Sequence, residues 1–130
     1  MATYKRLTVW HMAVSLLSEV NDVTRDGKRP TCPGEFSLVQ EIRDCARNIL
    51  QSIVRGAQVN THSRFLSYLR IANSASIELD TKLRIAKDCG ELRRPNIRPL
   101  LDKIEEFQKV LTRLRRPLER ALERGQGQPW

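Results

Sequence analysis

Basic side chains recur at helical spacing in the last quarter of the sequence, and their pattern points to a definite chemistry. Lys109, Arg113, Arg116, Arg120 and Arg124 follow one another at steps of four, three, four and four. If this segment is one helix, these side chains lie along a single stripe. Cations in such a row suit contacts to phosphates, which position a protein on a nucleic acid without reading its sequence.

Two further groups of arginines fit the same chemistry. Arg43, Arg47 and Arg55 share a predicted helical row, and Arg93 and Arg94 stand at a later turn. The 130-residue chain has a formal charge of +8, which invites a polyanionic partner. The alternative is a solvated face of salt bridges, because acidic residues alternate with the basic ones near the end of the chain. That alternative leaves the net excess of positive charge unexplained.

Residue types that carry catalysis are sparse. His11 and His62 are the two histidines, and they lie on different predicted elements. Cys45 falls on an apolar seam, as a small buried side chain does, and no predicted base stands beside Cys89. None of the common hydrolase, metalloprotease or phosphate-loop motifs is present. We therefore expect a protein that is not an enzyme, with no catalytic residue, metal ligand, cofactor or small-molecule substrate.

The cysteines and the apolar segments bear on the compartment. Three cysteines with no CxxC pair and no predicted leader favour reduced thiols in a cytoplasm. No apolar segment is long enough to cross a bilayer, so no membrane partner is expected.

Aromatic residues make up only 5% of the chain, which argues against platforms for base stacking.

Heptad spacing identifies the elements that must carry the basic rows. The clearest seam alternates steps of four and three and consists of Phe65, Leu69, Ala72, Ser76, Leu79, Leu83 and Ala86. Similar seams predict helices at about 4–24 and 35–55, from Asn60 or Thr61 to about 87–89, and from a cap at Asn96 onward. Short loops between four such helices predict an all-α, antiparallel, up-and-down bundle. The expected single domain covers residues 1–124, with a flexible tail at 125–130.

Three local features qualify this arrangement. Gly56 is expected to end the second helix as a left-handed cap, and Gly90 to stop the third. Pro117 either ends the last helix near Arg116 or bends it, since a proline inside a helix costs about 3 kcal/mol. The first helix carries a second apolar stripe that includes Trp10, Val14 and Leu17. This stripe is a candidate subunit interface, or it is buried within the bundle of one chain.

The order and spacing of these residues resemble a known family of bundles. The chain is similar to the four-helix proteins first noticed as open reading frames within intervening sequences of bacterial 23S rRNA genes. The likeness covers about residues 5–115 and is carried by Ile42-Arg43, Ala46, Ile49, Ile53, Gly56, Phe65, Leu69, Ile71-Ala72, Glu78-Leu79-Asp80-Thr81, Leu83, Leu100-Leu101, Ile104-Glu105-Glu106 and Leu111. The run from Ala75 to Asp80 also resembles the accessory variability proteins of diversity-generating retroelements, which share the bundle.

The resemblance implies a homo-oligomeric ring, typically a pentamer, with no catalytic residues. For the retroelement branch it further implies a basic surface that binds nucleic acid and a partner reverse transcriptase. Arg55 and Arg64 stand where the intervening-sequence pattern usually has acidic residues, which favours binding of a polyanion. The predicted contacts to RNA or DNA are Arg43, Arg47, Arg55, Arg64, Arg93, Arg94, Lys109, Arg113, Arg116 and Arg120. The competing hypothesis is a structural or protein-interaction module whose charge only aids solubility.

Overall fold

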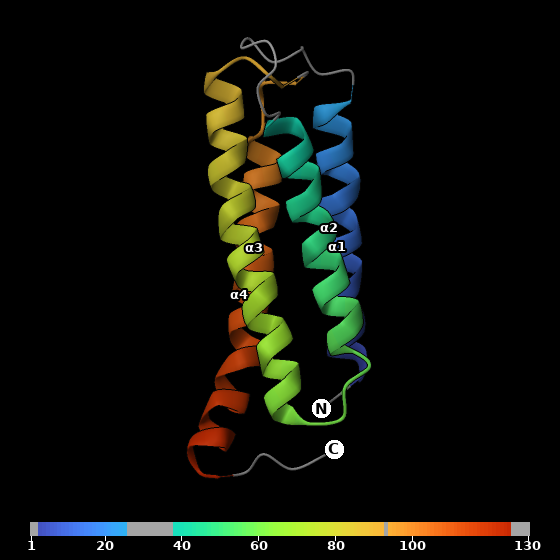
Figure 1. Cartoon of the computed structure of the whole chain (residues 1–130), viewed down its shortest axis with the longest axis vertical. Helices are drawn as coiled ribbons and strands as arrows, with labels where there is room; N and C mark the ends of the chain where they lie inside the picture. The colour runs from blue at the N-terminus through green and yellow to red at the C-terminus, as the bar shows by residue number, and fades with distance from the viewer. Residues whose placement is uncertain (1–2, 26–37, 93, 126–130) are drawn as a thin grey trace.

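Four long helices form an antiparallel up-and-down bundle in the computed structural model of the chain (Figure 1). The structure describes residues 3–25, 38–92 and 94–125, and the side chains of residues 3–7 are not part of that description. The helices are α1 (Thr3–Thr24), α2 (Leu38–Gly56), α3 (His62–Asp88) and α4 (Arg98–Glu123). No strand occurs among the described residues, so the predicted all-α class and four-helix architecture are confirmed.

The helices stand at the corners of a square in the order of the sequence. α1 packs against α2 and α4, and α3 packs against the same two helices, so α2 and α4 lie diagonally across the bundle. α1 and α3 run in one direction, and α2 and α4 run in the other (Figure 1). No helix in the described ranges is long and apolar enough to cross a membrane.

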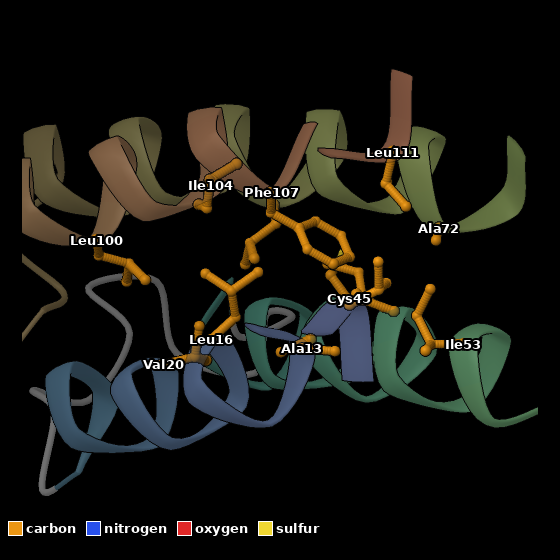
Figure 2. Close-up of a cluster of buried hydrophobic side chains, with 14 of the residues drawn as sticks. Ala13, Leu16, Val20, Cys45, Ile53, Ala72, Leu100, Ile104, Phe107 and Leu111 are labelled. Atoms are coloured by element: carbon orange, nitrogen blue, oxygen red, sulfur yellow. The ribbon is translucent and has the colours of Figure 1, made fainter. Parts of the chain in front are cut away.

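The core follows the predicted heptad seams. Every position of the α3 seam from Phe65 to Ala86 is buried, and the α4 seam is buried from Leu100 to Leu118. Phe107 lies at the centre, between side chains from α1 and α2, in a layer that Figure 2 shows. Side chains from all four helices therefore fill one core, and the buried α3 seam runs along the length of that core.

One polar pair interrupts the apolar contact between α3 and α4. Ser76 is fully buried; its hydroxyl donates to the carbonyl of Asn73 at 2.7 Å and accepts from Nε2 of Gln108 at 3.1 Å. The small side chain at this seam position allows α3 and α4 to pack closely. Its hydroxyl also satisfies a partner from the facing helix, which keeps a buried polar group from being left unpaired.

The ends of α3 match their predicted signals. Oγ1 of Thr61 accepts from the amide of Arg64 at 3.2 Å, so Thr61 is the N-cap. At the other end Gly90 has a φ of 72°, and the amide of Glu91 donates to the carbonyl of Ala86 at 2.9 Å. This is a Schellman ending, in which a left-handed glycine closes the last turn.

Two other boundary predictions were wrong. Gly56 is the last residue of α2 and does not have a positive φ; a Cβ there would meet Cδ1 of Phe65 at 3.2 Å and Cβ of Tyr68 at 3.3 Å. Glycine at this position allows the close approach of α3, because a Cβ would crowd Phe65 and Tyr68. The N-cap of α4 is Ile97 and not Asn96, although Oδ1 of Asn96 still accepts from the amide of Arg98 at 3.4 Å.

α4 continues through Pro117 to Glu123. Of the two alternatives, the helix therefore does not end near Arg116. Its C-terminal turns extend below the start of α3 in Figure 1. The segment predicted as a flexible tail falls almost entirely on residues 126–130, which lie outside the described residues.

Candidate nucleic-acid interface

The continuation of α4 places its basic residues on one solvent-facing stripe. Lys109, Arg113, Arg116, Arg120 and Arg124 are all exposed and lie opposite the buried seam of the same helix. Within the described ranges, Arg113, Arg116 and Arg120 have no ion-pair partner. We call these three side chains the α4 arginine stripe. Their charges remain available to an external anion.

Acidic neighbours neutralise the two flanks of this stripe. Lys109 approaches the carboxylates of Glu105 at 3.7 Å and Glu106 at 3.4 Å. Glu119 faces α3 and pairs with Arg70 at 3.8 Å and with Arg115 at 3.9 Å. Ion pairs thus account for the positive charges of Lys109 and Arg115, but not for those of the α4 arginine stripe. Exposed pairs of this kind contribute little, about 0–1 kcal/mol, so Lys109 can exchange its partner.

The predicted row on α2 has a different character. Nε of Arg43 donates to Oγ1 of Thr24 at 2.9 Å, and its Nη2 donates to the carbonyl of Thr24 at 3.0 Å. Arg43 therefore holds the end of α1. Arg47 is exposed and pairs with Asp44 at 3.2 Å. Since α2 and α4 lie diagonally across the bundle, the α2 row and the α4 arginine stripe are on separate surfaces.

The remaining predicted contacts are divided between the two ends of the bundle. Arg55, in the last turn of α2, and Arg64, in the first turn of α3, are exposed near the end where α4 finishes (Figure 1). Neither has an ion-pair partner among the described residues. Arg94 lies at the opposite end and pairs with Asp22 at 2.6 Å. Arg93 lies outside the described residues.

A polar cluster between α2 and α3 was not predicted from the sequence. Lys82 donates to Oε1 of Glu41 at 2.9 Å and approaches Oε2 of Glu78 at 3.7 Å. Beneath them the buried thiol of Cys45 donates to Oε2 of Glu78 at 3.1 Å. The four-residue spacing within each helix, 41 to 45 and 78 to 82, was the available signal. It could not be used without knowing how α2 and α3 pair.

This cluster changes the acid–base properties of its members. Burial and the hydrogen bond to Glu78 raise the pKa of Cys45 from 9.0 to about 12. The same hydrogen bond, followed by the charge of Lys82, lowers the pKa of Glu78, and the hydrogen bond to Glu41 raises the pKa of Lys82. Cys45 is therefore a protonated, unreactive thiol at neutral pH, as expected for a core residue.

Other chemistry-bearing residues do not gather into one site. His11 is exposed and contacts Trp10 edge-on, with ring centroids 4.9 Å apart, whereas His62 begins α3. Among the residues that the structure places, no group of three or more histidine, cysteine or acidic side chains could hold a metal ion. Cys45 and Cys89 are free thiols, the first buried and the second exposed.

Comparison with known proteins identifies the family. No curated protein matches the chain. A sequence model of the family described as 23S rRNA-intervening sequence protein matches residues 5–113. This range contains α1 except for its first two residues, all of α2 and α3, and more than half of α4. Arg116 and Arg120 lie beyond the matched residues. Because the match covers most of the sequence and agrees with a four-helix fold, the chain belongs to the 23S rRNA-intervening sequence protein family.

Proposed function

We propose that this protein is a non-enzymatic, ring-forming bundle that binds RNA or DNA electrostatically. The observation that carries the proposal is the α4 arginine stripe, Arg113, Arg116 and Arg120, which is exposed and has no acidic partner among the described residues. The charge of +8 and the exposed Arg55 and Arg64 support it. Such a surface contacts phosphates and reads little base sequence.

A triple charge reversal tests the proposed surface. Arg113→Glu, Arg116→Glu and Arg120→Glu should weaken binding to both a single-stranded RNA and a DNA duplex. The slope of log affinity against log salt should fall by about 2 to 3, since each phosphate contact contributes about 0.7 to 0.9. The measurement is a fluorescence-anisotropy titration at several salt concentrations between about 50 and 200 mM.

A matched control separates this surface from net charge alone. Arg25, Lys87 and Arg98 are exposed at the other end of the bundle, and their reversal to glutamate changes the net charge by the same amount. The control variant should retain most of the salt slope. Equal losses in both variants would assign the binding to overall charge, and binding that is weak and insensitive to salt in the wild type would refute the proposal.

Assembly into a ring is the second part of the proposal. Trp10 and Val14 are 40% and 37% exposed on α1, and Leu17 beside them is only half-buried, so the described residues of one chain leave the second stripe of α1 uncovered. Exposed apolar stripes of this kind favour a partner surface. Light scattering should give a mass several times the 15.0 kDa of one chain, with a pentamer as the expected size. A monomer at micromolar concentration would contradict assembly.

The cellular role follows the resemblance of the Ala75–Asp80 run. We infer a cytoplasmic accessory of a reverse transcriptase in a diversity-generating retroelement, with the α4 arginine stripe holding the template or its product. A reverse transcriptase gene and a variable repeat beside the coding sequence would support this role. Their absence, together with partner binding that survives the triple charge reversal, would favour a structural module of the intervening-sequence family.

A further inference from the structure

An apolar groove lies between α2 and α3, where these two helices pack side by side (Figure 1). It encloses about 450 Å³, and its apolar lining comes from Leu38, Ile77 and Ile85. Ile77 and Ile85 are 54% and 44% exposed, and Leu38 is half-buried. Large aliphatic side chains that share one hollow on the surface are typical of a docking site for another molecule.

The charged residues that line the groove leave it with an excess of negative charge. Glu41 and Glu78 are acidic and Lys82 is basic. The ammonium of Lys82 donates to Glu41 at 2.9 Å and lies 3.7 Å from Glu78, so two carboxylates share one cation. The hydrogen bond from Cys45 and the charge of Lys82 lower the pKa of Glu78, whose side chain is 60% exposed. Glu78 is therefore an ionised carboxylate at neutral pH that a cation from solvent can reach.

The local charge of the groove is opposite to that of the whole chain, which is +8. All the described residues that line the groove belong to α2 or α3, whereas the α4 arginine stripe faces solvent from another helix. A nucleic acid does not fit the groove, because its phosphates would meet the carboxylate of Glu78 and it has no aliphatic groups to fill the apolar part. The groove therefore suits a ligand that is both apolar and cationic.

The dimensions of the groove fit a helix. The hydrogen bond between Lys82 and Glu41 relates positions on the antiparallel helices α2 and α3. Three residues away on each helix, Leu38 lies opposite Ile85 at one end of the groove. Ile77 lies eight residues from Ile85, about 12 Å along α3, which is about two helical turns. The furrow between two packed helices accepts a ridge of side chains from a third.

We propose that this groove binds an amphipathic, basic helix of a partner protein. Its aliphatic side chains lie between Leu38, Ile77 and Ile85, and a lysine or arginine beside them pairs with Glu78. Helices that bind in grooves present anchors at spacings of three and four residues, which matches the length of this one. The incoming cation balances the negative charge that Lys82 leaves in the groove. The site is separate from the α4 arginine stripe and from the proposed ring, and it rests on neither.

Two peptides with the same apolar ridge test the charge preference. Each has about 18 residues, enough to form a helix, with leucines at the a and d positions of a heptad. The remaining positions carry alanine with lysine in one peptide and alanine with glutamate in the other. Fluorescence anisotropy should show at least tenfold tighter binding of the lysine peptide. Because the charge of +8 favours the glutamate peptide at long range, this preference requires a local acidic site.

Matched substitutions on α3 test the location. Ile85→Arg places a cation in the groove and should weaken binding of the lysine peptide at least tenfold. Ile71→Arg is the control, because Ile71 is 50% exposed on the same helix, does not line the groove, and lies about 21 Å from Ile85. Salt screens the added charge over that distance, so the control should change the affinity by less than about twofold. Circular dichroism should show that both variants are folded.

A second pair of variants tests the ion pair. Glu78→Gln removes the charge but keeps an acceptor for the thiol of Cys45, and it should weaken binding of the lysine peptide by about two- to fivefold, as for an exposed ion pair. Glu105→Gln makes the same change of charge at an exposed position on α4 and should leave the affinity unaltered. Equal affinities of these two variants would remove Glu78 from the site.

The remaining outcomes are decisive. A lysine peptide that does not bind, a glutamate peptide that binds as tightly, or equal losses in Ile85→Arg and Ile71→Arg would overturn the proposal. An assembly of the wild type that Ile85→Arg alone dissolves would show that a second copy fills the groove, which would also overturn it.

Salt distinguishes this site from the proposed nucleic-acid surface. Between about 50 and 200 mM salt, binding of the lysine peptide should hold or strengthen, because salt screens its repulsion from the charge of +8. Binding of RNA should fall steeply over the same range. Failure of one proposal therefore does not imitate failure of the other.

Discussion

Arg43 fastens the end of α1 to α2 by donating to both Oγ1 and the carbonyl oxygen of Thr24, at 2.9 and 3.0 Å. Thr24 is buried, and its own hydroxyl donates to the carbonyl of Val20 at 2.7 Å. The guanidinium therefore satisfies a carbonyl that the end of a helix leaves without an intrahelical donor. The spacing of Arg43 predicts a contact to phosphate, whereas in the structure its side chain makes a contact between α2 and α1.

Replacing Arg43 should affect stability more than binding. Arg43→Ala should lower the free energy of unfolding by about 1 to 3 kcal/mol, because a buried acceptor loses charged donors. Urea unfolding measures this loss. Arg47→Ala, on an exposed side chain of the same row, is the control and should change stability by less than about 0.5 kcal/mol. If Arg43→Ala left stability intact but lowered the salt slope for RNA, Arg43 would instead be a binding residue.

Alkaline pH should destabilise the protein in part through Cys45. The folded thiol has a pKa of about 12, whereas an unperturbed thiol has a pKa of 9.0. As pH rises above 9 the unfolded chain releases this proton and the folded chain keeps it, so the free energy of unfolding falls. Cys45→Ala should make that decline shallower in urea titrations between pH 8.5 and 10.5.

Lys82 contributes in the same direction, because its raised pKa stabilises the fold only while it remains protonated. Some alkaline decline should therefore remain in Cys45→Ala. Cys89→Ala, at an exposed site, is the control and should keep the full slope of the wild type. Identical slopes in the two variants would show that the environment of Cys45 does not carry the effect.

Removing Pro117 should strengthen α4. A proline at this position supplies no amide for the carbonyl of Arg113, four residues earlier, and α4 tolerates this defect. Pro117→Ala should raise the free energy of unfolding by about 1 to 3 kcal/mol and increase the helical circular dichroism signal. Pro99→Ala, in the first turn of α4 where amides lack helical partners anyway, should change stability by less than about 0.5 kcal/mol. A destabilised Pro117→Ala variant would show that α4 requires the proline at this position.

The close approach at Gly56 should tolerate no larger side chain. Gly56→Leu should lower the free energy of unfolding by about 1 to 3 kcal/mol, because Phe65 and Tyr68 occupy the space that the added atoms need. Thermal and urea unfolding measure the change. Ala57→Leu, at the neighbouring exposed position, should stay within about 0.5 kcal/mol of the wild type. Equal stabilities of the two variants would mean that α3 moves aside.

Heptad spacing and capping residues predicted the features of this fold that are set by residues within a single helix. The buried seams, the Thr61 cap and the Gly90 stop each follow from residues close together in the sequence. The role of Gly56 could not be predicted in this way, because the side chains that would crowd a Cβ there belong to the next helix. A glycine at a helix end looks the same in sequence whether it supplies a left-handed turn or space for a neighbour.

The candidate site divides along the same line. The α4 arginine stripe follows from the spacing of its residues if α4 continues through Pro117. Sequence spacing alone did not decide whether the helix continues through this proline or ends before it. The partner of Arg43 belongs to the preceding helix, and the cluster around Cys45 depends on how α2 and α3 pair. Spacing along one helix identifies which charges share a face. It does not identify which of them other helices neutralise.

The buried pair of Ser76 and Gln108 has a consequence for the uniqueness of the assembled chain. A purely apolar heptad seam is almost periodic, so α4 could slide along α3 by seven residues and still bury leucines and isoleucines. A shift that brought Leu101 to the place of Gln108 would leave the Ser76 hydroxyl facing an apolar side chain and would raise the energy of that slipped alignment. One hydrogen bond thereby disfavours one of the alternative alignments of the seam. It also determines how far the last turns of α4, with Arg116 and Arg120, project from the end of the bundle.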